Sequence, residues 1–346
     1  MNDSPRSVLP ITLDAALRDA EVLDVKARTL AITHLASAYL ERLGRTEPRW
    51  HAHAEHDLGP AVLAALLRAI ERDPATPIQA LAAAGLGQIG APELLAAVPD
   101  EWFTRTDPDA AYLRECAAIG WTLLGGAARP VSGDMAQNTY DAVVARLRVG
   151  LAADQPELRY QCATGLAELE GAAAEDALAQ ALARETIPTI RGALVSALGE
   201  IDPPSPHTCD VLAPLCDEPH TPTAFAAALA LTVARDPRSG RQLLAALQRP
   251  EDRGRALEAL AALGPAAPPE ALPIVRRLAR SFFTPGLTRV RAAYALARLA
   301  PREGEAILER LSTALRGSVR EAVTDARAGL TQLAVRDAAR VRPEPP

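Results

Sequence analysis

Three histidines and two carboxylates stand close together near the start of the chain, at His51, His53, Glu55, His56 and Asp57. Imidazole and carboxylate groups are ligands that zinc accepts, and on a helix His53 would share a face with both His56 and Asp57. The sequence has no HExxH pattern and no second ligand cluster. Two interpretations therefore stay open: a zinc site built on His51, His53 and His56, or a solvated connection between helices. In either case these histidines would respond to mild acid.

Arginine recurs through the chain at intervals, with acidic residues often just before it. If the arginines lay exposed on one face, they would form a ladder for anions, because guanidinium groups bind carboxylates and phosphates through paired donors. If they are structural, the upstream acids Asp107, Asp109, Asp154 and Glu185 are their expected partners. The arginines concerned are Arg114, Arg159, Arg191, Arg253 and Arg289.

A short segment, residues 100–105, places Trp102 and Phe103 beside Arg105 in a chain that is only 3% aromatic. Tryptophan, phenylalanine and arginine are frequent in the centres of protein interfaces. This segment is therefore a candidate partner-binding patch. The alternative is that Trp102 and Phe103 fill a gap between helices.

Searches for catalytic motifs find none: there is no glycine-rich phosphate loop, GxSxG elbow, kinase motif set or cysteine–histidine nucleophile context. The four cysteines have no CxxC spacing, and reduced thiols are the default for a cytoplasmic protein. The N-terminus lacks a signal-peptide pattern, and no run approaches the roughly 18 apolar residues that span a bilayer. We expect a cytoplasmic protein with no catalytic activity, no cofactor and no membrane segment.

The elements that would position these residues are helices. About half of the residues (49%) are apolar, and alanine and leucine rather than aromatic or branched residues carry the burial. Small side chains favour close helix-on-helix contact and contribute little to a β-sheet. The net charge is −6, and all but one of the 37 basic residues are arginine. This balance disfavours a broad nucleic-acid surface, which needs a basic face.

The helices repeat. A template with an anchor at position 0, small residues at +3, +4 and +6, and apolar residues at +7 and +10 fits the five arginines above. Gln79 and Ala224 take the anchor place in two further copies, and Arg320 is a weaker match. Successive anchors are 35, 45, 32, 33, 29, 36 and 31 residues apart. Because one helix pair cannot bury its apolar face alone, pairs with a period near ~33 residues are expected to stack into an α-solenoid.

The segments Gln155–Gly171, Ile187–Ile201 and Leu287–Leu299 carry the pattern Pro-x-(Leu/Ile/Val)-Arg-x-x-Ala-Ala-x-Ala-Leu most clearly. This pattern resembles the second helix of HEAT repeats, in particular the bacterial type named after phycobilisome lyases, over roughly residues 60 to 335. The resemblance implies that each anchor arginine bonds acids or carbonyls between adjacent repeats. Proteins with such repeats include scaffolds, adaptors, chaperone-like lyases and regulators.

We therefore predict an all-α protein: an α-solenoid of about eight stacked antiparallel helix pairs, HEAT- or armadillo-like. Residues 1–58 would form a helical cap or degenerate first repeat with a polar, histidine-rich connection, 59–337 the solenoid, and 338–346 a flexible tail. The long step between Arg114 and Arg159 predicts an inserted loop at 125–138. Whether that loop has a role stays open.

The predicted function is non-enzymatic binding of another protein along the concave, second-helix face, where Tyr160 is the residue that the template leaves free. Together with Trp102, Phe103 and Arg105 it makes up the candidate partner-binding set. One alternative is a HEAT-type lyase or chaperone that acts on a protein bearing a prosthetic group. A second, less favoured by the charge, is a HEAT-like nucleic-acid-binding protein.

Overall fold

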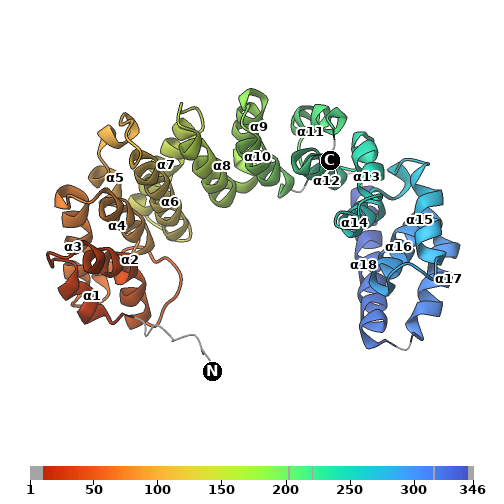
Figure 1. The fold of residues 1–346 in the computed structure, drawn as a ribbon, viewed down its shortest axis with the longest axis horizontal. Helices are drawn as coiled ribbons and strands as arrows, with labels where there is room; N and C mark the ends of the chain where they lie inside the picture. Colours follow the sequence, from red (N-terminus) through yellow and green to blue (C-terminus); the bar gives the residue numbers. More distant parts are fainter. Residues whose placement is uncertain (1–10, 202, 220, 315, 342–346) are drawn as a thin grey trace, which may run out of the picture. The chain divides into compact units, whose positions relative to one another are not determined.

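The computed structural model describes residues 11–341, apart from 202, 220 and 315, and within them it contains helices and turns but no strand (Figure 1). The predicted all-α class and the α-solenoid of helix pairs are confirmed. The chain divides into two compact units, residues 1–181 and 182–346, and α9 (Glu175–Arg184) crosses the division.

Unit 1 holds four complete helix pairs in chain order. They are α1 (Leu13–Asp19) with α2 (Val25–Arg42), α3 (Gly59–Arg72) with α4 (Thr76–Gln88), α5 (Leu94–Ala97) with α6 (Ala110–Ala128), and α7 (Asp134–Gly150) with α8 (Pro156–Glu170). Short 3₁₀ turns lie at η1 (Ala52–Ala54) and η2 (Asp100–Phe103).

Unit 2 begins within α9 and continues with α10 (Pro188–Gly199) and four further pairs. These are α11 (Pro206–Leu212) with α12 (Pro222–Val233), α13 (Gly240–Ala246) with α14 (Arg253–Leu263), α15 (Ala271–Arg280) with α16 (Gly286–Leu299), and α17 (Pro301–Ser312) with α18 (Gly317–Val341).

Proline opens several second helices. Pro156, Pro188 and Pro222 stand at the first positions of α8, α10 and α12, each after a residue in extended conformation. At that place the missing N–H costs nothing, because the first four N–H groups of a helix have no partner within it. The proline also disfavours helix in the residue before it, so the boundary between turn and second helix is fixed locally.

The second helices pack successively on one another: α2, α4, α6 and α8 in unit 1, and α10, α12, α14, α16 and α18 in unit 2. Template positions are buried as predicted; after Arg159, for example, the side chains of Cys162, Ala163 and Leu166 are fully buried. Glycine lets α4 and α6 touch through their backbones. A Cβ added to Gly87 would lie 2.2 Å from the carbonyl oxygen of Gly120, and one on Gly120 would lie 2.6 Å from that of Ala83.

The predicted loop at 125–138 is wrong in most of its length. Helix α6 continues to Ala128 and α7 begins at Asp134, so only residues 129–133 connect them. The extra residues lengthen the two helices instead. Gly125, which suggested a loop, is a packing glycine within α6: a Cβ there would lie 2.7 Å from Cδ1 of Leu169.

The N-terminal segment forms a helix pair of the same kind as those that follow, because α1 packs on α2 and α2 packs on α4. Its anchor is Arg28, which is 9% exposed and bonds Asp73 in the next pair. Among the described helices, none combines the length and the apolar character that a membrane crossing requires.

Candidate functional site

The anchor side chains close the turn between the first and second helix of their own pair. Arg159 donates from Nη1 to the carbonyl oxygens of Ala153 and Asp154, both at 2.9 Å. Side-chain hydrogen bonds to carbonyl oxygens five or six residues upstream are also made by Arg28, Gln79, Arg253 and Arg320. These carbonyls end a first helix or its turn, where helical partners are missing, so a side-chain donor satisfies them, and where that donor is an arginine its charge adds to the stabilisation.

Three anchors also bind a carboxylate, and each of these acids belongs to the following pair. Arg114 Nε donates to Glu157 Oε1 at 2.6 Å, Arg28 bonds Asp73, and Arg191 Nη2 donates to Glu218 Oε1 at 2.7 Å. Arg114 and Arg191, two of the predicted anchors, therefore bond an acid of the adjacent pair, and Arg28, which was not predicted as an anchor, does the same.

Three of the four acids predicted upstream of an anchor make the following contacts in the structure. Asp107 pairs with Arg105, Glu185 accepts from the N–H groups of Thr186 and Ile187, and Asp154 offers Arg159 its backbone carbonyl. A carboxylate only a few residues upstream lies in the same tight turn, where nearer donors satisfy it. Arg289 alone of the five predicted anchors has a buried Nε with no hydrogen-bond partner in the described structure.

The histidine segment folds into the 3₁₀ turn η1 rather than an α-helix. The side chain of His53 is buried, and its ring centroid lies 5.1 Å from that of His51. His56 instead turns its Nδ1 back to accept from the N–H of Leu58 at 3.1 Å. In the described part of the chain no three histidine, cysteine or acidic side chains are placed to hold a metal ion, so the zinc interpretation is not supported.

Burial sets the protonation chemistry of His53 in this turn. The pKa of His53 is lowered chiefly because burial disfavours its charged form, while the nearby Glu93 carboxylate partly opposes that shift. The expectation of a solvated connection is therefore wrong for His53.

The structure places the four residues predicted to bind a partner in different environments. Trp102 is 1% exposed and belongs to the core, so for this residue the gap-filling alternative holds. Arg105 is bonded to Asp107 through both Nε and Nη2. Tyr160 is exposed on α8, as the template predicts. Phe103 lines a cavity of unit 1.

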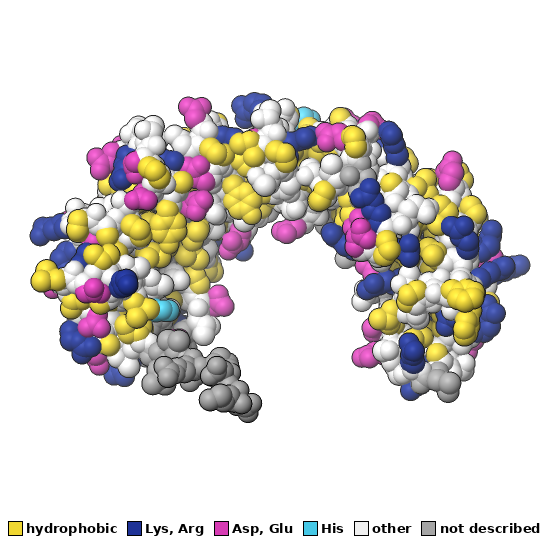
Figure 2. Space-filling view, viewed as in Figure 1, with side chains coloured by type: hydrophobic (Ala, Val, Ile, Leu, Met, Phe, Trp, Pro, Cys, Tyr) yellow, Lys and Arg dark blue, Asp and Glu magenta, His cyan; other side chains and the backbone are white. Residues whose placement is uncertain are grey.

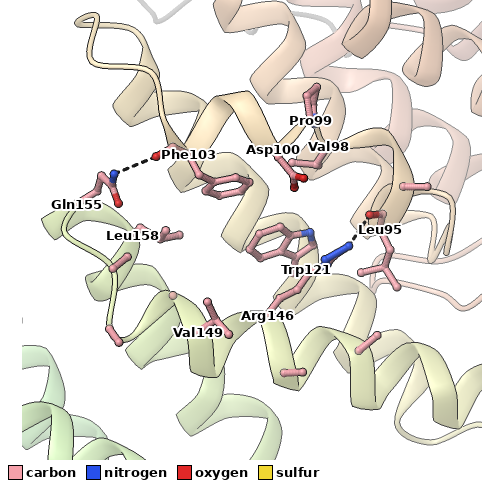
Figure 3. Close-up of a pocket in the computed structure, with 16 residues that line it drawn as sticks. Leu95, Val98, Pro99, Asp100, Phe103, Trp121, Arg146, Val149, Gln155 and Leu158 are labelled. Atoms are coloured by element: carbon pink, nitrogen blue, oxygen red, sulfur yellow. Dashed lines mark hydrogen bonds between the residues drawn. The ribbon is translucent and has the colours of Figure 1, made fainter.

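That cavity is a groove of about 1030 Å³ between α5 and η2 on one side and α7 with the start of α8 on the other (Figure 3). The rings of Phe103 and Trp121 form its floor, stacked with centroids 5.5 Å apart and planes inclined by 21°. Its walls are mainly apolar, with Val98, Leu158 and the 75% exposed side chain of Val149.

The polar groups of the groove are few and fixed. Arg146 donates from Nη2 to the carbonyl oxygen of Leu95 at 2.7 Å, and its Cζ lies 5.6 Å from the Trp121 ring centre. Gln155 donates to the carbonyl oxygen of Phe103 at 2.9 Å. The indole N–H of Trp121 is buried without an acceptor. Asp100 supplies a carboxylate at the rim.

The groove exists because the first helix of its pair is short. Helix α5 ends at Ala97 and is followed by the turn η2, so it covers less of α6 than α3 or α7 would. Trp121 occupies the +7 template position, where sister helices have leucine, and its ring fills part of the opening. The groove therefore opens among the first helices, whereas the sequence predicted binding along the second.

Sequence reasoning missed Trp121, Arg146 and Val149. Only Trp121 carried a signal, because a tryptophan where the repeat expects leucine is too large for the ordinary packing site. Val149 is exposed and Arg146 is half-buried on α7, and neither matches a position of the template.

Residues 144–232 match the family of HEAT repeats, a stretch that includes α8 and α10 and ends within α12. No curated protein matches the sequence. The chain is similar to many solved structures, three of which are the following. An engineered protein has 18% identity and a TM-score of 0.42, with 92% of this chain and 98% of that chain covered. The complex of CpcE and CpcF of phycocyanin lyase from Nostoc sp. PCC7120 has 16% identity and a TM-score of 0.39, with 95% and 99% covered. A mutant of Kap121p has 13% identity and a TM-score of 0.43, with 91% of this chain and 37% of that chain covered.

Proposed function

We propose that this chain, which carries HEAT repeats, is a non-catalytic scaffold that binds a partner protein, and that the groove of unit 1 holds an apolar segment of that partner. The observation that carries the proposal is the Phe103–Trp121 stack at the floor of the groove, beside the exposed Val149. Aromatic and arginine side chains in a desolvated pocket are typical of the energetic centre of a protein interface.

The chemistry of the remaining side chains supports binding rather than catalysis. Burial raises the pKa of Cys162 and Cys216 to about 12, so these thiols stay protonated at neutral pH and are poor nucleophiles. The net charge of −6 supports a protein ligand over a nucleic acid.

The test places a photo-crosslinking amino acid at position 149 or at position 160 in the full-length protein, in the cells that make it. We expect a discrete crosslinked partner from position 149. The substitutions V149E and A145E, both at exposed groove positions, should abolish co-purification of that partner because they introduce a charge into an apolar contact.

The control is L23E, the same kind of change at an apolar side chain that is 97% exposed and outside the groove. It should leave the partner bound. A crosslink from position 160 and none from position 149 would move the binding surface to the second helices and contradict the assignment of the groove.

A second candidate function is supported by the size of the groove. A volume of about 1030 Å³ is at the upper end of cofactor and small-molecule sites, which are also mostly apolar with a few fixed polar groups. A lyase or chaperone that acts on a protein bearing a prosthetic group would use such a groove for the group itself. Visible absorbance in protein purified from its own cells, lost in V149E, would favour this function over a plain scaffold.

A further inference from the structure

Arg289 departs from the pattern that the other anchor arginines follow. It is the anchor of α16, yet its Nε is buried without a hydrogen-bond partner. Within the described residues, no hydrogen bond or ion pair joins its guanidinium to the turn upstream or to the next helix pair. A cation left in this state is costly, since a partly buried charge is normally paired.

The sequence explains why Arg289 has no partner. The acids that bind other anchors stand six residues before the next anchor, as Asp73 and Glu218 do, or two residues before it, as Glu157 does. In the pair after Arg289 these two places hold Ala314 and Ser318. The pair after Arg289 thus lacks a carboxylate at the two positions from which other pairs bind the preceding anchor.

Two further arginines join Arg289 in one pocket. Arg280 at the end of α15 and Arg310 near the end of α17 line a cavity of about 460 Å³ together with Arg289 and three apolar side chains. No carboxylate lines this cavity among the described residues. Glu303 lies at 2.9 Å from Arg280 but is shared with Arg276, so the pocket keeps an excess of positive charge. Figure 2 shows basic side chains gathered over α15 and α17.

Exposed aromatic rings stand in the turn that joins α15 to α16. Phe282 is 87% exposed and Phe283 is 97% exposed, with their ring centroids 6.4 Å apart. They are two of only four phenylalanines in the chain. Arg280 precedes this turn and Arg289 follows it, so the two phenylalanines stand in the connection between the helices that carry these arginines.

We propose that Arg280, Arg289 and Arg310 form a docking site for an acidic segment of a partner protein, which inserts a carboxylate into the pocket and lays a neighbouring apolar side chain on Phe282 and Phe283. Guanidinium groups bind carboxylates through paired hydrogen bonds. The ligand carboxylate would supply the charge that the repeat itself omits at Ala314 and Ser318. This site lies within unit 2 and does not depend on the groove of unit 1.

Charge and shape favour an acidic protein segment over an anionic membrane. The whole chain carries a net charge of −6, which a negatively charged bilayer surface would repel. The arginines also line a cavity rather than a flat face, and its volume suits one or two side chains. An acidic peptide segment meets both conditions.

The test selects peptides from a phage-displayed library of random sequences on the full-length protein and measures their affinity by fluorescence polarisation. We expect the selected peptides to place Asp or Glu beside Leu, Phe or Trp. The double variant R289E/R310E should weaken their binding by more than about tenfold, and F282S/F283S by a similar factor. The matched control R302E changes an exposed arginine of α17 outside the pocket and should bind as the wild type does.

Three outcomes would overturn the proposal. One is a library that yields no acidic peptides, and another is binding that survives both double variants. The third is sedimentation of the protein with phosphatidylserine vesicles that depends on Arg289 and Phe282 while the peptides do not bind, because that result would assign the surface to a membrane.

Thermal unfolding supplies an independent measurement. Because the described residues give Arg289 Nε no hydrogen-bond partner, R289Q should leave the Tm unchanged or raise it, whereas R191Q should lower it by removing the partner of Glu218. If R289Q lowered the Tm as much as R191Q does, Arg289 would be a structural anchor like the others and the docking site would lose its central residue.

Discussion

The guanidinium of Arg114 shows what an anchor does at the scale of a single residue. It is 6% exposed, donates to the carbonyl oxygens of Trp102 and Arg105, and binds Glu157 of the next pair. One side chain therefore closes its own turn and joins two repeats. This dual role explains why arginine, with several fixed donors, recurs at the anchor position.

We predict that R114M lowers the free energy of unfolding by about 3–5 kcal/mol, because it leaves the Glu157 carboxylate poorly solvated and two carbonyls without a donor. Urea unfolding followed by circular dichroism measures the change. The double variant R114M/E157L should recover much of the loss, since no unpaired charge then remains. Equal stability of R114M and the wild type would contradict the inter-repeat role.

His53 predicts a pH dependence. Its pKa in the folded protein lies below the ordinary value of 6.5, chiefly through burial, whereas the unfolded chain takes up the proton near 6.5. The unfolded state therefore binds more protons as the pH falls below about 6.5, so stability is complete above that pH and declines below it, by at most about 1.4 kcal/mol per pH unit.

Urea unfolding at pH about 7.5 and about 5.5 tests this linkage. The variant H53Q should lose the part of the pH dependence that His53 causes. H34Q removes an exposed histidine of α2 and should keep it. A wild type that gains stability on acidification through this range would show that the sign is wrong.

At the scale of helices, glycine decides how closely neighbours approach. Gly87 and Gly120 bring the backbones of α4 and α6 into contact, while Gly126, on the exposed side of α6, has only ordinary space around it. The repeat template places Gly120 at a small packing position, whereas Gly126 falls within the loop predicted at 125–138. In the structure, close packing of the helices requires glycine at Gly120 but not at Gly126.

We therefore predict opposite signs for two like substitutions in α6. G120A should destabilise the protein by about 1–3 kcal/mol, because the added Cβ meets a backbone oxygen that cannot move freely. G126A should stabilise it by about 0.5–1 kcal/mol, since alanine loses less backbone entropy in a helix. Thermal unfolding of the two variants measures both changes in stability. A stabilising G120A would show that the backbone of α4 can shift to accommodate the added Cβ.

At the scale of the whole molecule, the chain forms two compact units that each contain complete helix pairs. In repeat proteins each pair depends mainly on its neighbours. We predict that fragments 11–185 and 186–341, separated in the turn after α9, each retain a helical circular dichroism spectrum and unfold cooperatively. A fragment that is unfolded alone but folds when mixed with the other would show that the units depend on one another.

The sequence by itself determined the helical class, the repeat and the buried positions, because these follow from local periodicity: small residues at +3, +4 and +6 give the same packing face wherever they occur. It also located the anchors at Arg114, Arg159 and Arg191. It misplaced their acids, since it compared residues close in sequence while the carboxylates of Glu157 and Glu218 come from the following pair.

Only the tertiary structure shows the two cavities at which we propose that ligands bind. The groove of unit 1 depends on how little of α6 the short α5 covers. The pocket of unit 2 depends on arginines from three helices lining one cavity, whose described lining residues include no carboxylate. Both cavities are spaces left between helices. A periodic pattern specifies what fills the repeated contacts, whereas a cavity arises where one repeat departs from the others, and its shape depends on residues distant in the chain.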